Sequence, residues 1–342
     1  MRCWLLVFPC ENSKKQGDMA SSADQVRQLY TSFAANEARE VSPLYEALAK
    51  EVVRHDELVQ FVMSLPEGKR QPNLMLAAVR HTCGTPDGPE HFVQLVRQHE
   101  ARIRSVILAR STQTNEPARC ATLVPLLASL PQPLALIEVG ASAGLCLLPD
   151  RYGYDYGHKR VLPDYEGPAP IPIFPCQTND ETRIPSALPK VVWRLGIDLN
   201  PIDLMDADEV AWLETLVWPG QESRADRLRS AIAVAQAELP KVVQGNLLQD
   251  LPRYAAEAPD DATLIVFHTA VLAYLSAQSD RDRFASIVRE TGAVWISNEA
   301  PRVLPHITAK LTIEAPRNRF LLALDSEPVA LTGPHGQSIH WL

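Results

Sequence analysis

A glycine-containing turn within residues 134–144 is the first place where the sequence suggests chemistry. The apolar run LALIEV at 134–139 predicts a buried strand, and Gly140, Ser142 and Gly144 follow it directly. Glycines let the backbone turn sharply and approach a ligand closely, and the first N–H groups of a following helix bind anionic groups. A strand–loop–helix junction of this kind predicts a ligand-binding loop.

Two kinds of site use a related loop but agree less well with this chain. A dinucleotide site needs G-x-G-x-x-G, whereas position 142 is Ser. GASAG matches the G-x-S-x-G elbow of serine hydrolases, with Ser142 as nucleophile and His268 or His335 as base. That elbow normally follows several strands and an upstream oxyanion loop, yet the chain before Leu134 has a helical pattern. A serine hydrolase therefore stays the alternative.

The pattern E-x-G-x-x-x-G that begins at Glu138 resembles the first motif of class I S-adenosylmethionine-dependent methyltransferases. VVWRLGIDLNP resembles the second strand of that superfamily, and VVQGNLLQDLP resembles the third. The resemblance implies that Glu138 lies near the methionine part of the cofactor, that Asp198 holds the ribose hydroxyls and that Asn246 meets the adenine edge. The candidate cofactor-binding residues are Glu138, Gly140, Ser142, Gly144, Asp198 and Asn246.

Two residues are candidates for removing a proton from a methyl acceptor. His268 is the last residue but one of the apolar run TLIVFHT, and Glu299 ends the run AVWISNE. Both are expected at the carboxyl edge of the sheet, where a positioned base can act on a nitrogen or oxygen nucleophile. A buried, hydrogen-bonded histidine is the alternative interpretation of His268.

Two further segments supply candidate substrate contacts. In QTNEPARC, Asn115, Glu116 and Arg119 either cap a helix or fold over the site and contact the acceptor. In DRYGYDYG, the alternating tyrosines indicate one aromatic face of a strand or hairpin. Tyr154 on that face either packs in the core or stacks on a planar substrate.

The elements that must position these residues begin only after a helical region. Residues 1–20 are interpreted as a poorly ordered leader, and 21–132 as an all-helical N-terminal cap domain. Apolar residues recur there at three- and four-residue spacing, and Ser42-Pro43 predicts a capped helix start.

Residues 133–342 predict a doubly wound, mostly parallel α/β sheet of the class I methyltransferase type. Short apolar runs alternate with helical segments, which implies parallel βαβ units. The strands are expected at 134–139, 191–198, 241–246, 263–269 and 293–299. The tail after residue 319 suggests an antiparallel pair at the sheet edge. A proline-rich insertion at 149–189 is typical of a lid, a binding loop or an excursion.

Bulk composition excludes several classes of function. The formal net charge of −8 gives no general attraction to nucleic acid or to an anionic membrane. The six cysteines show no zinc or redox spacing, so neither a metal site nor a disulfide framework is expected. No segment has the length and apolarity of a membrane span. We therefore expect a cytoplasmic protein whose partner is a small molecule.

Most of the chain from about Ser22 also resembles an uncharacterised bacterial family of domains of unknown function, DUF2332. Segments that carry the resemblance include SPLYEALA, LIEVGASAGL, RLGIDLNPID, VFHTAVLAYL and ALTGPHG. The implied fold is methyltransferase-like. The sequence thus predicts an S-adenosylmethionine-dependent methyltransferase of a small-molecule acceptor, with a serine hydrolase or a catalytically silent binding protein as alternatives.

Overall fold

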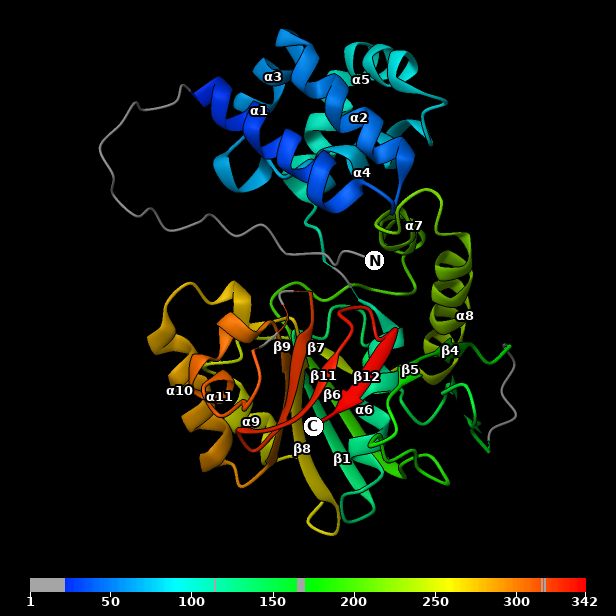
Figure 1. Cartoon of the computed structure of the whole chain (residues 1–342), viewed down its shortest axis with the longest axis vertical. Coiled ribbons are helices and arrows are strands. Elements are labelled where there is room, and N and C mark those ends of the chain that lie inside the picture. The colour runs from blue at the N-terminus through cyan, green and yellow to red at the C-terminus, as the bar shows by residue number, and fades with distance from the viewer. Residues whose placement is uncertain (1–21, 114, 165–169, 315, 317) are drawn as a thin grey trace. The chain divides into compact units, whose positions relative to one another are not determined.

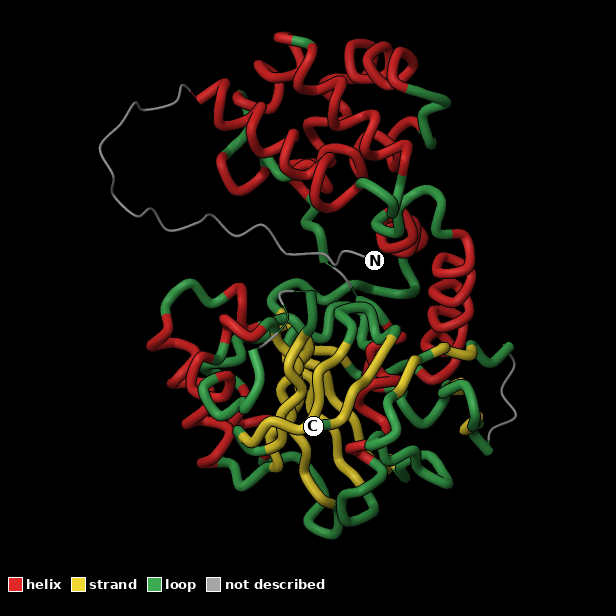
Figure 2. The backbone as a smooth tube through the Cα atoms, viewed as in Figure 1, coloured by secondary structure: helices red, strands yellow, loops and turns green. Residues whose placement is uncertain are grey.

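The computed structural model describes residues 22–113, 115–164, 170–314, 316 and 318–342 (Figure 1). The predicted leader at 1–20 lies outside the described residues. The described residues form two compact units: one takes 22–113 with Ala211–Ala225, and the other takes Asn115–Val210 with Asp226–Leu342. Helices and strands are not mixed evenly, because the strands belong to the second unit (Figure 2).

Helices make up the regular structure of residues 22–113. They are α1 (Ser22–Phe33), the π-helical turn η1 (Ala34–Ala38), α2 (Pro43–Arg54), α3 (Asp56–Met63), η2 (Glu67–Lys69), α4 (Pro72–Cys83) and α5 (Pro89–Ala109). As predicted, Ser42 caps α2: its hydroxyl accepts a hydrogen bond from the backbone N–H of Tyr45 at 3.4 Å, and Pro43 opens the helix.

The segment Ala211–Ala225 completes the core of this helical unit from a distant part of the chain. Trp218 is buried, and its ring centroid lies 5.2 Å from the rings of both Phe33 and Tyr45. The helical domain was predicted to end at residue 132. In the structure the division falls at residue 114, because helix α6 (Cys120–Leu127) is buried in the second unit.

A nine-stranded sheet forms the second unit, with the order β5-β12-β11-β10-β9-β8-β1-β6-β7. Its parallel centre comprises β7 (Val242–Gln244), β6 (Val191–Asp198), β1 (Leu134–Val139), β8 (Thr263–Thr269) and β9 (Val294–Glu299). β10 (Phe320–Leu324), β11 (Glu327–Thr332) and β12 (Ser338–Trp341) continue it antiparallel, and β5 (Gln177–Thr178) pairs parallel with β12. The prediction of an α/β fold with a large, mostly parallel sheet is confirmed.

Helices follow the parallel strands, as expected for βαβ units. Between β6 and β7 come α7 (Ala207–Thr215) and α8 (Glu222–Glu238), and α9 (Leu251–Ala255) precedes β8. α10 (Gln278–Glu290) links β8 to β9, and α11 (Pro305–Thr308) follows β9. Figure 1 shows α9, α10 and α11 on the same side of the sheet.

One local prediction was wrong. No α-helix follows the glycine loop. Only the 3₁₀ turn η4 (Leu145–Leu147) forms before Pro149, and a proline disfavours helical backbone at the residue before it. The tail pairs antiparallel as predicted, with three strands where two were expected.

The insertion at 149–189 has strands of its own. β2 (Gly153–Asp155) pairs with β3 (Arg160–Val161) and β4 (Ile173–Pro175) in a small separate sheet, and β5 joins the large one. Within the described ranges, no helix has both the length and the apolarity to cross a membrane.

Candidate functional site

The reversal of strand order lies between β1 and β8. β1 pairs with β6 on one side and with β8 on the other, so the chain winds outward in opposite directions from this point. In open α/β sheets, ligands bind beyond the carboxyl ends of the strands at such a switch point. The glycine loop follows β1 and the segment Ala270–Tyr274 follows β8, so these two segments form the candidate site.

The glycine loop is held in left-handed backbone conformations. Gly140, Ser142 and Gly144 have φ angles of 71°, 52° and 72°. Asp198, at the end of β6, supports the loop, because its Oδ2 accepts the N–H of Ser142 at 2.8 Å while its Oδ1 accepts the N–H of Asn200 at 2.8 Å. Such a φ angle is costly for a serine, and a fixed partner for its N–H maintains it.

Asn115 also fixes the loop. Its Nδ2 donates to the carbonyl of Ala141 at 2.9 Å, and its Oδ1 accepts the N–H of Leu145 at 3.0 Å. Asn115 was predicted to contact the acceptor or to cap a helix. The structure shows a buried side chain that bridges two backbone groups of the glycine loop, which is a positioning role.

Val271 covers one side of Gly140. A Cβ atom placed on Gly140 would lie 2.5 Å from Cγ2 and 2.7 Å from Cγ1 of Val271. Gly140 is therefore required both for its φ angle and for the close approach of the opposite segment. Ala270, the preceding residue, has a φ of 59°. The two sides of the switch point thus touch through Val271.

Glu138 is a buried acid at the end of β1. Only 2% of its surface is exposed, and Oε2 has no hydrogen-bond partner among the described residues. Burial raises the pKa of Glu138 well above its usual value, and Cys146 and Asp198 add to the increase, while Arg119 opposes it. The neutral carboxylic acid is therefore favoured.

Ser142 Oγ also has no hydrogen-bond partner in the described part of the chain. A serine nucleophile needs a base within hydrogen-bond reach, and neither His268 nor His335 supplies one here. Among the described residues, β1 and its loop therefore contain two enclosed oxygens without a hydrogen-bond partner, Glu138 Oε2 and Ser142 Oγ.

His268 belongs to a buried chain of hydrogen bonds. Trp295 Nε1 donates to His268 Nε2 at 3.0 Å, and His268 Nδ1 lies 2.7 Å from Oε1 of Glu299. An indole N–H can only donate, so Nε2 accepts and Nδ1 carries the proton. With both ring nitrogens engaged and the side chain fully buried, the prediction of His268 as a general base does not fit this geometry.

Glu299 connects this chain to the segment after β8. Its Oε1 accepts the N–H of Val271 at 2.7 Å and of Leu272 at 2.9 Å, in addition to its contact with His268. Oε2 is enclosed and has no partner among the described residues. Glu299 thus holds the backbone of Ala270–Tyr274 in place.

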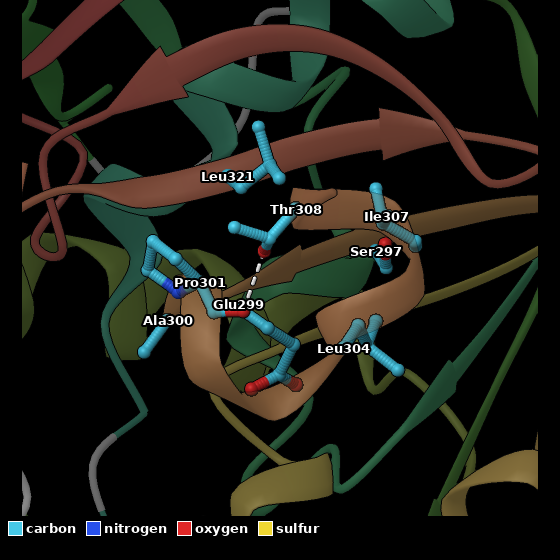
Figure 3. Close-up of a pocket in the computed structure, with 8 residues that line it drawn as sticks. All are labelled: Ser297, Glu299, Ala300, Pro301, Leu304, Ile307, Thr308 and Leu321. Atoms are coloured by element: carbon cyan, nitrogen blue, oxygen red, sulfur yellow. Dashed lines mark hydrogen bonds between the residues drawn. The ribbon is translucent and has the colours of Figure 1, made fainter. Parts of the chain in front are cut away.

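A small notch lies beside Glu299, with an empty volume of about 170 Å³ (Figure 3). Its lining residues are Ser297, Glu299, Ala300, Pro301, Leu304, Ile307, Thr308 and Leu321. This volume includes space open to solvent, so the notch is too small for a nucleoside cofactor.

Arg119 and Glu116 are largely occupied by protein contacts. The Arg119 guanidinium donates to the carbonyls of Pro334 and Thr269, at 2.8 and 3.0 Å. Glu116 accepts the N–H of Ala118 at 3.4 Å and lies 3.6 Å from Nδ1 of His335. Both side chains are buried, so these contacts connect strands and loops at the carboxyl edge and leave little surface for a substrate.

Two other predicted site residues have structural roles. Tyr154 is fully buried, and its hydroxyl donates to the carbonyl of Pro149 at 2.7 Å, as expected from its packing interpretation. Asn246 follows β7, where its Oδ1 accepts the N–H of Leu248 at 2.8 Å and closes a turn. No cluster of metal-binding side chains occurs within the described residues.

Most of the chain matches one family of bacterial proteins. A model of the family described as "Uncharacterized protein conserved in bacteria (DUF2332)" matches residues 27–341. The chain belongs to this family. No curated protein and no solved structure shows significant similarity to it.

Two site residues of this DUF2332 protein were not predicted from sequence. Val271 is an ordinary apolar residue, and nothing in its type indicates that it faces Gly140. Trp295 lies within a predicted strand, and its bond to His268 crosses from β9 to β8. The strand order could have indicated this bond, because β8 and β9 are neighbours and the ends of VFHT and SNE therefore lie close together.

Proposed function

We propose that this DUF2332 protein is an S-adenosylmethionine-dependent methyltransferase that acts on a small-molecule acceptor and binds its cofactor at the switch point. The observation that carries the proposal is the enclosed Glu138 Oε2, which has no hydrogen-bond partner among the described residues and lies next to a glycine loop and near Asp198. Buried polar atoms without partners are rare, so such a group at a switch point suggests a ligand contact.

The residue types suit the cofactor. Asp198 is a carboxylate at the end of β6, and a carboxylate is a suitable acceptor for the two ribose hydroxyls. Glu138 and Ser142 can take hydrogen bonds from the methionine part. Val271 lies against Gly140, so a cofactor can approach that glycine closely from this side only when Val271 moves.

The cofactor supplies an electrophilic methyl group when it is bound. The protein must then align the acceptor, exclude water and, for a protonated nucleophile, accept a proton. Glu299 remains the candidate proton acceptor, because its Oε2 has no hydrogen bond among the described residues. His268 is assigned to orienting Glu299.

The first test is calorimetric titration of S-adenosylhomocysteine into the wild type and Asp198→Asn. The variant keeps an oxygen for the Ser142 N–H but loses the charge and the acceptor for the Asn200 N–H. Affinity should therefore fall at least tenfold, consistent with about 1.5–3 kcal/mol for a bond to a charged group. Asp155→Asn is a matched control, because Asp155 also closes a turn through the N–H of Gly157, at 2.9 Å, but belongs to the insertion.

Absence of heat and of thermal stabilisation at millimolar ligand would contradict the proposed function. Equal affinity of the wild type and Asp198→Asn would remove Asp198 from the site. Binding without methyl transfer to any acceptor, among amines and hydroxyl compounds, would instead favour a binding protein.

A further inference from the structure

The segment Ala270–Tyr274 closes the switch point in the structure. It starts at a residue with a φ of 59°, a left-handed conformation that is unusual for alanine. Val271 then turns its side chain onto Gly140, at the distances given above. A ligand that approaches the backbone of Gly140 from this side must displace Val271.

One carboxylate oxygen accepts two backbone N–H groups of this segment, and Arg281 Nε donates to its Leu272 carbonyl at 3.2 Å. Glu299 Oε1 accepts the N–H groups of Val271 and Leu272, which follow the strained residue directly. His268 donates to the same oxygen, and Trp295 fixes the tautomer of His268. Glu299, His268 and Trp295 are all buried, so water does not compete for these bonds.

We propose that Ala270–Tyr274 is a gate over the switch point and that Glu299, positioned by His268 and Trp295, is its latch. Opening rotates the backbone at Ala270, releases the N–H groups of Val271 and Leu272 from Glu299, and moves Val271 off Gly140. The identity of the ligand that the gate admits rests on the proposed function, whereas the latch is a property of the protein alone.

Hydrogen exchange of the Val271 and Leu272 amides tests the latch without any ligand. Glu299→Gln keeps an oxygen acceptor and should leave these amides protected, whereas Glu299→Leu should speed their exchange by about tenfold or more. Trp295→Phe is a milder change, because His268 can then adopt the other tautomer and stop donating to Glu299. It should speed exchange of the same two amides while the amides of β8 stay protected.

Ligand affinity tests the gate. Val271→Ala removes the side chain that covers Gly140 and should tighten S-adenosylhomocysteine binding about tenfold, as expected if only about a tenth of the wild type is open. Val294→Ala is the matched control, because Val294 is also partly buried but starts β9 at the opposite end from Glu299. The control should bind as the wild type does.

The two tests separate failure of the gate from failure of the proposed function. Unchanged exchange in both Glu299→Leu and Trp295→Phe overturns the latch. Equal or weaker binding by Val271→Ala overturns the gate. If no variant binds the ligand but the latch variants exchange faster, the proposed function fails and the latch stands.

Discussion

Glu138 illustrates at the residue scale how position changes the chemistry of an acid. Its type and its place before the glycine loop were visible in the sequence, but its protonation depends on burial and on Cys146 and Asp198, which come from other segments. Because its pKa is raised, the folded protein without ligand keeps a proton on Glu138 that a free carboxyl would lose.

Binding of S-adenosylhomocysteine should release that proton. A cationic amino group beside Glu138 favours the ionised carboxylate and lowers its pKa, so affinity should increase as pH rises from below towards the raised pKa. Calorimetry in buffers of different ionisation enthalpy measures the proton directly. Glu138→Gln should bind without this release, and identical proton counts for both proteins would place the amino group elsewhere.

Residue types were thus easier to predict than residue roles. Four polar residues lie at or near the ends of predicted apolar strands, and the structure has them at one edge of the sheet: Glu138, Asp198, His268 and Glu299. The sequence left two roles open for His268, a base or a buried, hydrogen-bonded side chain. The choice between them depends on the N–H of Trp295, whose direction is set only by the packing of β9 against β8. Side-chain hydrogen bonds between distant segments leave no periodic signal in a sequence.

At the scale of elements, apolar runs in the sequence predicted the strands well. β1, β6 and β8 have the predicted bounds, since buried parallel strands are short apolar runs. The missing helix after the glycine loop shows the limit of this signal. The apolar residues Leu145–Leu148 suit a helix start and a buried turn equally, and Pro149 favours the turn.

One element carries a buried acid that makes stability depend on pH. Glu37 lies in η1 and is 8% exposed, and burial raises its pKa from 4.5 to about 8. The folded state therefore holds this proton more tightly than the unfolded state, so stability should fall as pH rises from about 4.5 to about 8, with a slope of up to about 1.4 kcal/mol per pH unit.

Glu37→Gln should remove this dependence. The variant and the wild type should have similar free energies of unfolding at pH 4, and the variant should be more stable at pH 8.5, as urea denaturation at each pH would show. Glu40→Gln is the control, because Glu40 lies just beyond η1 and is exposed. A constant difference between the Glu37 variant and the wild type across this range would contradict the raised pKa.

At the scale of the whole molecule, the chain passes between the two units three times, after residues 114, 210 and 225. Composition and periodicity predicted helices in 21–132 and strands later, but not that Ala211–Ala225 packs with the first group. That assignment depends on the contact of Trp218 with Phe33 and Tyr45, about 175–185 residues away in sequence.

Trp218→Ala should therefore destabilise the helical unit by about 3–5 kcal/mol, the usual cost of emptying a large buried aromatic site. Trp218→Phe should cost less, because a phenyl ring still packs beside Phe33 and Tyr45. Urea denaturation followed by hydrogen exchange of α1 and α2 would measure this. An equal effect of both variants would indicate that the indole ring is not packed as described.

The return of Ala211–Ala225 to the helical unit has a consequence for synthesis. The ribosome completes residues 22–113 about 100 residues before it makes this segment, which takes about 5–20 s at roughly 5–20 residues per second. Helices form within microseconds, so α1–α5 can form long before the ribosome makes the core residues of Ala211–Ala225. During that interval the nascent chain exposes the aromatic surface of Phe33 and Tyr45, a surface of the kind that chaperones bind.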